Sequence, residues 1–151
     1  LMETGGDIVQ TKELVQTLGI EANVTYRNYM SEDERIQTIQ AADVVADHFC
    51  AGSFGGTFVE VLACGKPLIH YLEMDNINLA YPEAPPILNA FSEKEICERL
   101  LACADAKFRA QLGEMARAWI LRYHRWQDVT ASLQHCLRLV HGRPAVYDVR
   151  S

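Results

Sequence analysis

Apolar residues gather in two short runs on either side of a helix-length segment. The first run, Val44 to Ala46, is rich in β-branched residues, and the second follows Pro67. Between them, a loop with three glycines precedes Thr57 to Cys64, which favours a helix. This order predicts strand, loop, helix and strand of a parallel α/β unit. The loop of such a unit lies at the carboxyl end of the sheet, where open α/β folds bind ligands.

Helix start and stop signals mark the segments before this unit. We expect Leu1 to Thr4 to belong to a strand, and Asp7 to cap a helix that ends at Gly19. One face of that helix carries Leu14, Val15 and Leu18. A short strand is predicted at Val24 to Tyr26, with the loop Arg27 to Met30 after it.

A capping box, in which a serine and a glutamate three residues later satisfy each other's backbone N–H groups, begins at Ser31. It opens a predicted helix whose Ile36 and Ile39 face inward and which ends near Ala42. A second capping box, Ser92 to Glu95, opens another helix further along the chain. One face of this second helix carries Ile96, Leu100 and Leu101.

The segment after the central unit has less regular patterning. Three prolines interrupt Leu72 to Pro86, which is either a loop closing over a ligand or a surface connection. Ile87 and Leu88 are predicted to form the last strand. A long helix follows, with apolar residues at helical spacing: Phe108, Leu112, Met115, Trp119, Ile120 and Tyr123.

A final helical segment follows the long helix. Its apolar face would carry Val129, Leu133, Leu137 and Val140. Trp119 and Trp126 fit core or interdomain packing better than ligand stacking. If a neighbouring domain has been removed, part of the final helix's apolar face is exposed and favours self-association.

Composition sets outer limits. With 151 residues, 49% hydrophobic and 23% charged, the chain suits one domain with a sizeable core and has length enough for five strands. No apolar stretch reaches the roughly 20 residues of a membrane-spanning helix. The chain begins at Leu1 rather than Met, and we expect it to be cut from a longer protein.

Charge and the reactive side chains exclude several functions. A net charge of -6 with scattered basic residues argues against nucleic acid as a partner. The five cysteines are odd in number and lack a C-x-x-C pair, as expected of reduced core thiols in a cytoplasmic protein. The five histidines show no ligand spacing such as H-E-x-x-H, so no metal is predicted.

The glycine loop has the chemistry of an anion site. At Gly55 and Gly56 no Cβ keeps the backbone from a ligand, and the N–H groups opening the next helix face any anion there. A phosphate is the expected ligand. The loop is neither a P-loop, since Pro67 follows Lys66, nor a G-x-G-x-x-G fingerprint.

Two residues of this region have competing interpretations. Ser53 stands in A-G-S-F-G, one residue away from the G-x-S-x-G nucleophile elbow, with Asp75 and histidines downstream. However, Phe49 to Gly52 separate it from the strand end, which disfavours a nucleophile. Glu60 either completes a capping box with Thr57, or places its carboxylate beside the anion pocket, where it would accept from ribose hydroxyls.

The stretch F-G-G-T-F-V-E-V-L-A-C-G-K-P-L-I resembles the donor-binding signature E-G-F-G-x-x-x-x-E-A-x-A-x-G-x-P-V-I of retaining GT-B glycosyltransferases, group 1 or family 4 type. The resemblance covers roughly Gly5 to Val140 and implies a Rossmann-like three-layer αβα domain with a parallel sheet, its first strand and helix truncated. Asp43 matches the aspartate of the family's A-D-V strand, and Asn23 and Val24 match the start of the preceding strand. His124 to Trp126 resemble the kink region where the family's C-terminal helix turns back, so the resemblance implies a break there.

The resemblance assigns donor-binding roles. Glu60 maps onto the glutamate that binds the donor ribose, while the loop approaches the sugar and diphosphate through Ser53, Phe54, Gly55, Gly56 and Thr57. The loop with Arg27 and Asn28 would lie against the nucleobase. No separate cofactor or metal is implied, because the nucleotide-sugar is itself a substrate.

One departure concerns the family's first glutamate, which contacts the donor sugar and falls eight residues before Glu60, where this chain has Gly52. Some members of the superfamily instead carry a D-Q-F-like triplet at the strand end. Asp47, His48 and Phe49 resemble that variant. We therefore hypothesise that Asp47 or His48 takes over part of the role, the alternative for Asp47 being a carboxylate that caps loop N–H groups.

The resemblance implies residues 1–141 as a nucleotide-sugar-binding domain and 142–151 as a frayed tail. The whole protein would transfer a hexosyl group from UDP or GDP to an acceptor with retention, without a metal, in the cytoplasm. The acceptor domain, and any peripheral membrane association, would belong to a missing N-terminal half, leaving this fragment inactive. Alternatives are a nucleoside-diphosphate-sugar 2-epimerase and a non-catalytic scaffold with a decayed donor site.

Overall fold

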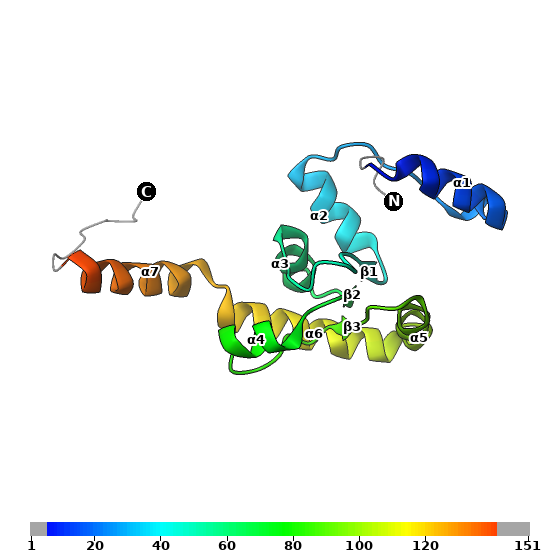
Figure 1. Ribbon diagram of the computed structural model, residues 1–151. Helices are drawn as coiled ribbons and strands as arrows, with labels where there is room; N and C mark the ends of the chain where they lie inside the picture. The colour runs from blue at the N-terminus through cyan, green and yellow to red at the C-terminus, as the bar shows by residue number, and fades with distance from the viewer. Residues whose placement is uncertain (1–5, 142–151) are drawn as a thin grey trace. The chain divides into compact units, whose positions relative to one another are not determined.

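The computed structural model describes residues 6–141, which fall into two compact units that divide between Thr38 and Ile39 (Figure 1). The first unit holds α1 (Ile8–Leu18), a 3-10 helix (Glu21–Asn23) and most of α2 (Glu32–Ala41). The second unit holds the end of α2 and every strand of the described residues. The predicted strand at residues 1–4 and the predicted tail at 142–151 lie outside the described residues.

The ends of the helices in the first unit lie largely where they were predicted. α1 ends at Gly19, whose φ of +64° lets its N–H return to the carbonyl of Gln16. Asp7 precedes α1, but its side chain makes no capping hydrogen bond. Of the predicted apolar face, Val15 is buried, whereas Leu14 and Leu18 are exposed.

The capping box at Ser31 is confirmed, whereas the strand predicted before it is wrong. The Ser31 N–H donates to Glu34 Oε2 over 2.8 Å, and the Glu34 N–H donates to Ser31 Oγ over 3.4 Å. The Ser31 hydroxyl, which donates to the Glu34 carboxylate, is the main cause of a lowered Glu34 pKa. Val24 to Tyr26 form no strand, and only Arg27 occupies a single bridge position.

The second unit alternates strands and helices. Its strands are β1 (Val45–Ala46), β2 (Leu68–His70) and β3 (Leu88–Asn89). Its helices after α2 are α3 (Gly56–Ala63), α4 (Met74–Ala80), α5 (Glu93–Ala102), α6 (Ala106–Tyr123) and α7 (Trp126–His141). The strands lie side by side in the order β1, β2, β3, all parallel. This confirms the predicted parallel α/β class, with three strands among the described residues.

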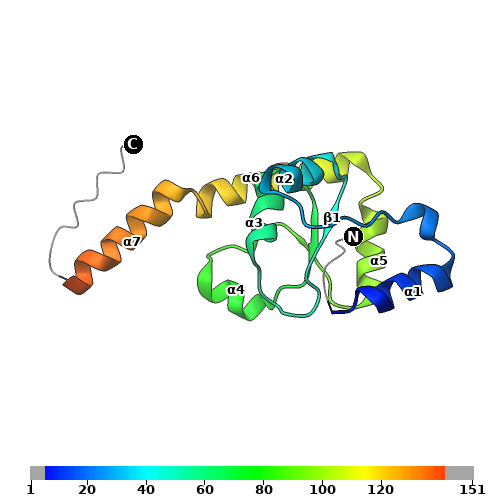
Figure 2. The ribbon, with the colours of Figure 1, turned by 90° about the horizontal axis from the view of Figure 1, so that it is seen from above.

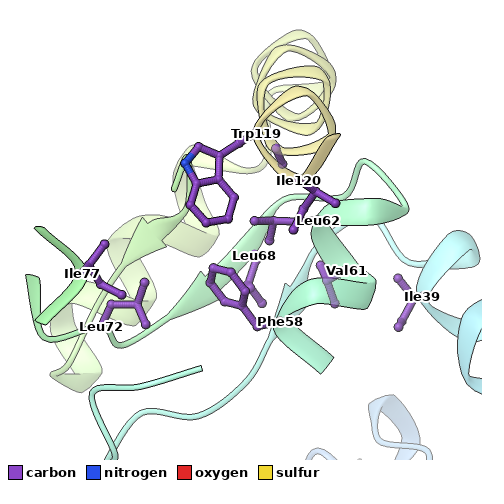
Figure 3. Close-up of a cluster of buried hydrophobic side chains, with 10 residues drawn as sticks. Ile39, Phe58, Val61, Leu62, Leu68, Leu72, Ile77, Trp119 and Ile120 are labelled. Carbon is purple, nitrogen blue, oxygen red and sulfur yellow. The ribbon is translucent and has the colours of Figure 1, made fainter. Parts of the chain in front are cut away.

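The sheet separates two buried clusters because successive strand residues point to opposite faces. Leu68 packs with Phe58 and Leu62 of α3 and with Trp119 and Ile120 of α6, as Figure 3 shows. Ile69 packs on the opposite side in a second cluster. The other members of that cluster are Leu88, Ala90, Cys103 and Leu112, with Val44, Phe49, Ile96 and Phe108 against them.

α3 and α6 approach each other backbone to backbone. A Cβ added to Gly113 would lie 2.1 Å from the Gly65 carbonyl oxygen, so a side chain at this crossing has no room. Arg117 donates to the carbonyl of Ala63, at the last turn of α3. α3 is therefore held along its length and at its C-terminal end, while its N-terminus points to the loop that follows β1 (Figure 2).

Three predictions need correction in this unit. The segment Leu72 to Pro86 is no irregular loop, because α4 forms within it ahead of the first proline. The predicted apolar face of α5 is covered only at Ile96, which packs against the second cluster, whereas Leu100 and Leu101 are 46% and 70% exposed. Three of the five free cysteines are exposed, so the description as core thiols holds for Cys103 but not for Cys50, Cys97 or Cys136.

α6 and α7 break at His124 and Arg125, as predicted. Trp119 is 4% exposed and belongs to the core, whereas Trp126 is 60% exposed. The predicted apolar face of α7 is exposed at each of its positions: Val129, Leu133, Leu137 and Val140. No helix among residues 6–141 is long and apolar enough to cross a bilayer.

Candidate functional site

The loop after β1 is fastened to the carboxyl end of β2. The N–H of Tyr71 donates to the carbonyl of His48 over 3.0 Å, and the N–H of Glu73 donates to that of Gly52 over 2.8 Å. These bonds continue the parallel ladder beyond the strand ends, where Asp47 N–H donates to Ile69. The loop thus sits where parallel α/β sheets bind ligands.

The conformation and packing of the loop explain why position 52 is glycine. It is buried with a φ of +65°, and an added Cβ would lie 3.1 Å from Glu73 Cβ. A side chain here would be strained by the left-handed backbone and would also meet Glu73. The absence of the family's first glutamate at this position therefore follows from the path of the loop.

Gly55 and Gly56 differ from Gly52. Neither has a positive φ, and an added Cβ at either would find no atom within 4 Å. The fold therefore does not require glycine at these two positions. What they leave is open space directly in front of α3.

The N-terminus of α3 is not closed by a side chain. The helix begins at Gly56 with Gly55 as its N-cap, no capping hydrogen bond from a side chain and no acidic residue in its first turn. The capping box predicted for Thr57 and Glu60 is therefore wrong, because Thr57 is already the second helical residue. Glu60 lies further along α3 and is partly buried. Capping of the helix therefore does not explain a carboxylate at this position.

Ser53 and Phe54 occupy the last loop positions before α3. Ser53 is exposed, and its carbonyl lies 3.0 Å from His70 Nε2. The ring of Phe54 stacks on Phe58 of α3, with 4.5 Å between centroids. The arrangement does not support a nucleophile elbow, since His70 contacts the Ser53 backbone and Ser53 stands well beyond the end of β1 at Ala46.

Asp47 and His48 lie together at the carboxyl end of β1. His48 Nδ1 is 2.9 Å from Asp47 Oδ1, and the two side chains are 55% and 26% exposed, respectively. His48 has a φ of +51°, the single positive φ outside glycine among the described residues. The Asp47 carboxylate holds the imidazole at the surface of the loop, where both groups can contact a ligand.

Besides Phe58 of α3, two aromatic side chains at the ends of other helices lie near the Phe54 ring. His124, at the end of α6, meets its ring edge-on at 6.0 Å, and Tyr81, after α4, lies 6.2 Å away. Tyr81 Oη and His124 Nε2 are 3.2 Å apart. Burial lowers the pKa of His124 and raises the pKa of Tyr81, so both side chains favour their neutral forms.

The structure brings most of the predicted site residues into one region of the second unit: Asp47, His48, Ser53, Phe54, Gly55, Gly56, Thr57 and Glu60. Arg27 and Asn28 belong to the first unit, where both are exposed, and their role at the nucleobase stays a prediction. Sequence reasoning missed His70, Tyr81 and His124. His70 could have been noticed in the sequence, because it is an ionisable residue at the end of an otherwise apolar predicted strand.

Other features of the second unit do not coincide with this region. A cavity of about 390 Å³ lies between α6 and the segment before β3, lined in part by Glu83, Met115 and Trp119, and it contains no predicted site residue. Asp43, matched to the family's A-D-V strand, pairs with Arg109 at 3.0 Å. Within residues 6–141, no cluster of three His, Cys, Asp or Glu side chains could hold a metal ion.

Comparisons with known proteins agree with this architecture. No protein family model matches the chain. A curated D-inositol 3-phosphate glycosyltransferase from Rhodococcus jostii (strain RHA1) is 39% identical over 57 residues, which are 38% of this chain and 13% of the relative.

Two solved structures share the fold, each with a TM-score of 0.70 and 20% identity. Anabaena Alr3699/HepE, solved in complex with UDP-glucose, is matched over 89% of this chain and 38% of its own. Sucrose-phosphate synthase (tll1590) from Thermosynechococcus elongatus is matched over 91% and 35%. The chain thus spans little more than a third of these proteins. The two solved structures confirm the parallel α/β fold that the resemblance implies.

Proposed function

We propose that this chain is the donor-binding part of a glycosyltransferase and holds a nucleotide-sugar at the N-terminus of α3. The observation that carries the proposal is the pair Gly55 and Gly56, which the fold does not require and which form the N-cap and first residue of a helix without a side-chain cap. Glycines in such a place let the phosphates of a ligand reach backbone N–H groups. The curated relative is named a glycosyltransferase, and HepE was solved in complex with UDP-glucose, and both support the choice of ligand.

In this arrangement the loop and α3 bind different parts of the donor. Backbone N–H groups from Ser53 to Thr57 donate hydrogen bonds to the diphosphate, and the positive end of the α3 dipole stabilises it as it leaves. The Glu60 carboxylate accepts hydrogen bonds from the ribose hydroxyls. Asp47 or His48 contacts the transferred sugar in place of the glutamate that Gly52 cannot supply. Arg27 and Asn28 bind the base.

The reaction we propose is transfer of a hexosyl group from UDP or GDP with retention and without a metal ion. The remainder of the protein would supply the acceptor site, so the 151 residues alone would bind nucleotide weakly and turn nothing over. We further propose a cytoplasmic location, with any membrane contact made by that remainder.

A titration of the whole protein with UDP, GDP and ADP tests the proposal. We expect one of the three to bind, and Glu60→Gln to weaken it about tenfold, because one ribose contact is worth about 1.4 kcal/mol. The matched control is Glu98→Gln, an exposed glutamate on α5, which should leave the dissociation constant unchanged. If no nucleotide binds, the proposal fails, and the alternative of a non-catalytic scaffold with a decayed donor site is favoured.

A further inference from the structure

His70 is the last residue of β2, and no surface of it reaches solvent. It is the single charged or polar residue in the buried set of the described chain. An imidazole is costly to bury unless its nitrogens are hydrogen-bonded, so its presence in the core needs an explanation. None of the roles assigned above to the donor site uses it.

The hydrogen-bond partners of the ring fix its tautomer. Nε2 lies 3.0 Å from the carbonyl oxygen of Ser53. A carbonyl can only accept, so Nε2 carries the hydrogen and donates it. Nδ1 has no partner in the part of the chain that the structure describes. The buried ring therefore makes one hydrogen bond, from Nε2 to the Ser53 carbonyl in the glycine loop.

This bond fixes the orientation of a peptide unit next to the open helix N-terminus. The Ser53 carbonyl and the Phe54 N–H belong to one planar trans peptide and point in opposite directions. With the carbonyl turned to the buried His70, the Phe54 N–H is directed away from the core. Two other bonds, Tyr71 to His48 and Glu73 to Gly52, hold the earlier part of the loop through backbone alone. The hydrogen bond from His70 to Ser53 comes from a side chain and lies nearer to Gly55 along the chain than either of these two.

The ring also supports the loop by packing. Phe58 meets the His70 ring edge-on with 5.4 Å between centroids, and Phe58 stacks in turn on Phe54. His70 therefore restrains Phe54 in two ways, through the preceding carbonyl and through the ring of Phe58. A purely apolar residue of similar size could supply the packing but not the hydrogen bond.

We propose that His70 is a positioning residue for the donor diphosphate. By holding the Ser53 carbonyl, it presents the Phe54 N–H and the following N–H groups of the loop to the phosphates. The inference rests on the proposed nucleotide site, but it assigns to that site a residue that touches neither nucleotide nor sugar.

Two substitutions separate the hydrogen bond from the packing. In His70→Gln, the amide nitrogen lies the same number of bonds from Cβ as Nε2 and can donate to Ser53. In His70→Asn, the side chain is one bond shorter and cannot reach. The control is His135→Asn on the exposed surface of α7. Each variant of the whole protein is titrated with UDP, GDP and ADP, and its unfolding transition and kcat and KM are measured.

We expect His70→Asn to raise the dissociation constant of the bound nucleotide at least about tenfold, and His70→Gln to stay within about threefold of the unmodified protein. The loss should appear in KM for the donor as well as in nucleotide affinity, with similar unfolding transitions for the two variants. Equal affinity in the folded Asn and Gln variants would overturn the proposal.

A measurement on the unmodified protein keeps the inference testable if the Asn variant does not fold. Nitrogen-15 NMR of the imidazoles should show His70 with its hydrogen on Nε2 and in slow exchange with water, unlike the half-exposed His48. If the hydrogen is on Nδ1 instead, His70 does not donate to the Ser53 carbonyl, and the proposed positioning role is wrong. If no nucleotide binds, the proposed function fails together with the positioning role, while the Nε2 signal still reports the Ser53 bond by itself.

Discussion

The helices α3 and α5 follow β1 and β3, the strands on either side of β2 in one parallel sheet, yet they are stabilised in opposite ways. α5 begins with a complete capping box between Ser92 and Glu95 and buries none of its residues. α3 has no side-chain cap, but it buries Phe58, Val61 and Leu62, and Gly65, just beyond its end, lies against Gly113 of α6. A helix anchored by packing can leave its first N–H groups to a ligand, whereas a helix anchored by its cap cannot.

Electrostatics reinforces the contrast. The Glu95 carboxylate accepts the N–H groups of Ser92 and Phe91 and the Ser92 hydroxyl, and these bonds lower the pKa of Glu95 to about 2. The positive end of the α5 dipole is thus already matched by a carboxylate. The first turn of α3 holds no acidic residue. An external anion is the remaining way to complement it.

The largest predicted effect removes the packing that anchors α3. Gly113→Ala places a Cβ against the Gly65 carbonyl and should lower the free energy of unfolding by about 3 kcal/mol, since backbone must move. Ala110→Gly, at an exposed position of the same helix, should cost only about 1 kcal/mol. Denaturant unfolding measures both. Equal costs would mean that the α3–α6 crossing is not what anchors α3.

The next effect concerns the position where the family carries glutamate. Gly52→Glu should destabilise the protein by about 2 kcal/mol, because a side chain at a φ of +65° is strained and meets Glu73. It should also fail to improve donor affinity or turnover. Gly6→Glu, with open space around its Cβ position, is the control and should be nearly neutral. Increased activity in Gly52→Glu would show that the loop is not fixed as described.

A smaller effect tests the cap of α5. Ser92→Ala should lower stability by about 1 kcal/mol. The lowered Glu95 pKa means that this carboxylate contributes stability above its unfolded value of about 4.5, and the contribution is lost as the pH falls towards about 2. Unfolding measured over that range should show a steeper loss in the unmodified protein than in Glu95→Gln. Parallel profiles would contradict the cap.

The smallest stability change comes from giving α3 the cap it lacks. Gly55→Asp should raise the free energy of unfolding by a few tenths of a kcal/mol, since a carboxylate would then accept the first N–H groups. The same carboxylate competes with phosphate and repels it, so nucleotide affinity should fall at least about tenfold. Gly55→Ala is the control without a carboxylate. Unchanged affinity in Gly55→Asp would place the phosphates elsewhere.

Much of the architecture could be predicted because the signals are local. The capping boxes at Ser31 and Ser92, the stop at Gly19 and the break after Tyr123 each depend on a few adjacent residues. The central strand, loop, helix and strand followed from the apolar runs. The strand boundaries, by contrast, shifted by a residue or two, because hydrogen-bonding partners and not local propensity set them.

The parts that could not be predicted depend on contacts between distant residues. The α3 start is displaced from Thr57 to Gly56 because the loop is held from β2, so the apparent capping box never forms. The apolar face of α5 has the spacing of a core face, yet only Ile96 packs against the core, and sequence periodicity cannot tell which positions another surface covers. His70 and Tyr81 lie near Phe54 only in three dimensions.

The most direct test is a structure of the whole protein with a bound nucleoside diphosphate. The account predicts the diphosphate at the N-terminus of α3, within hydrogen-bonding distance of the backbone between Phe54 and Thr57, and the ribose hydroxyls on Glu60. A diphosphate bound elsewhere, or an α3 N-terminus covered by another part of the protein with no room for phosphate, would contradict it.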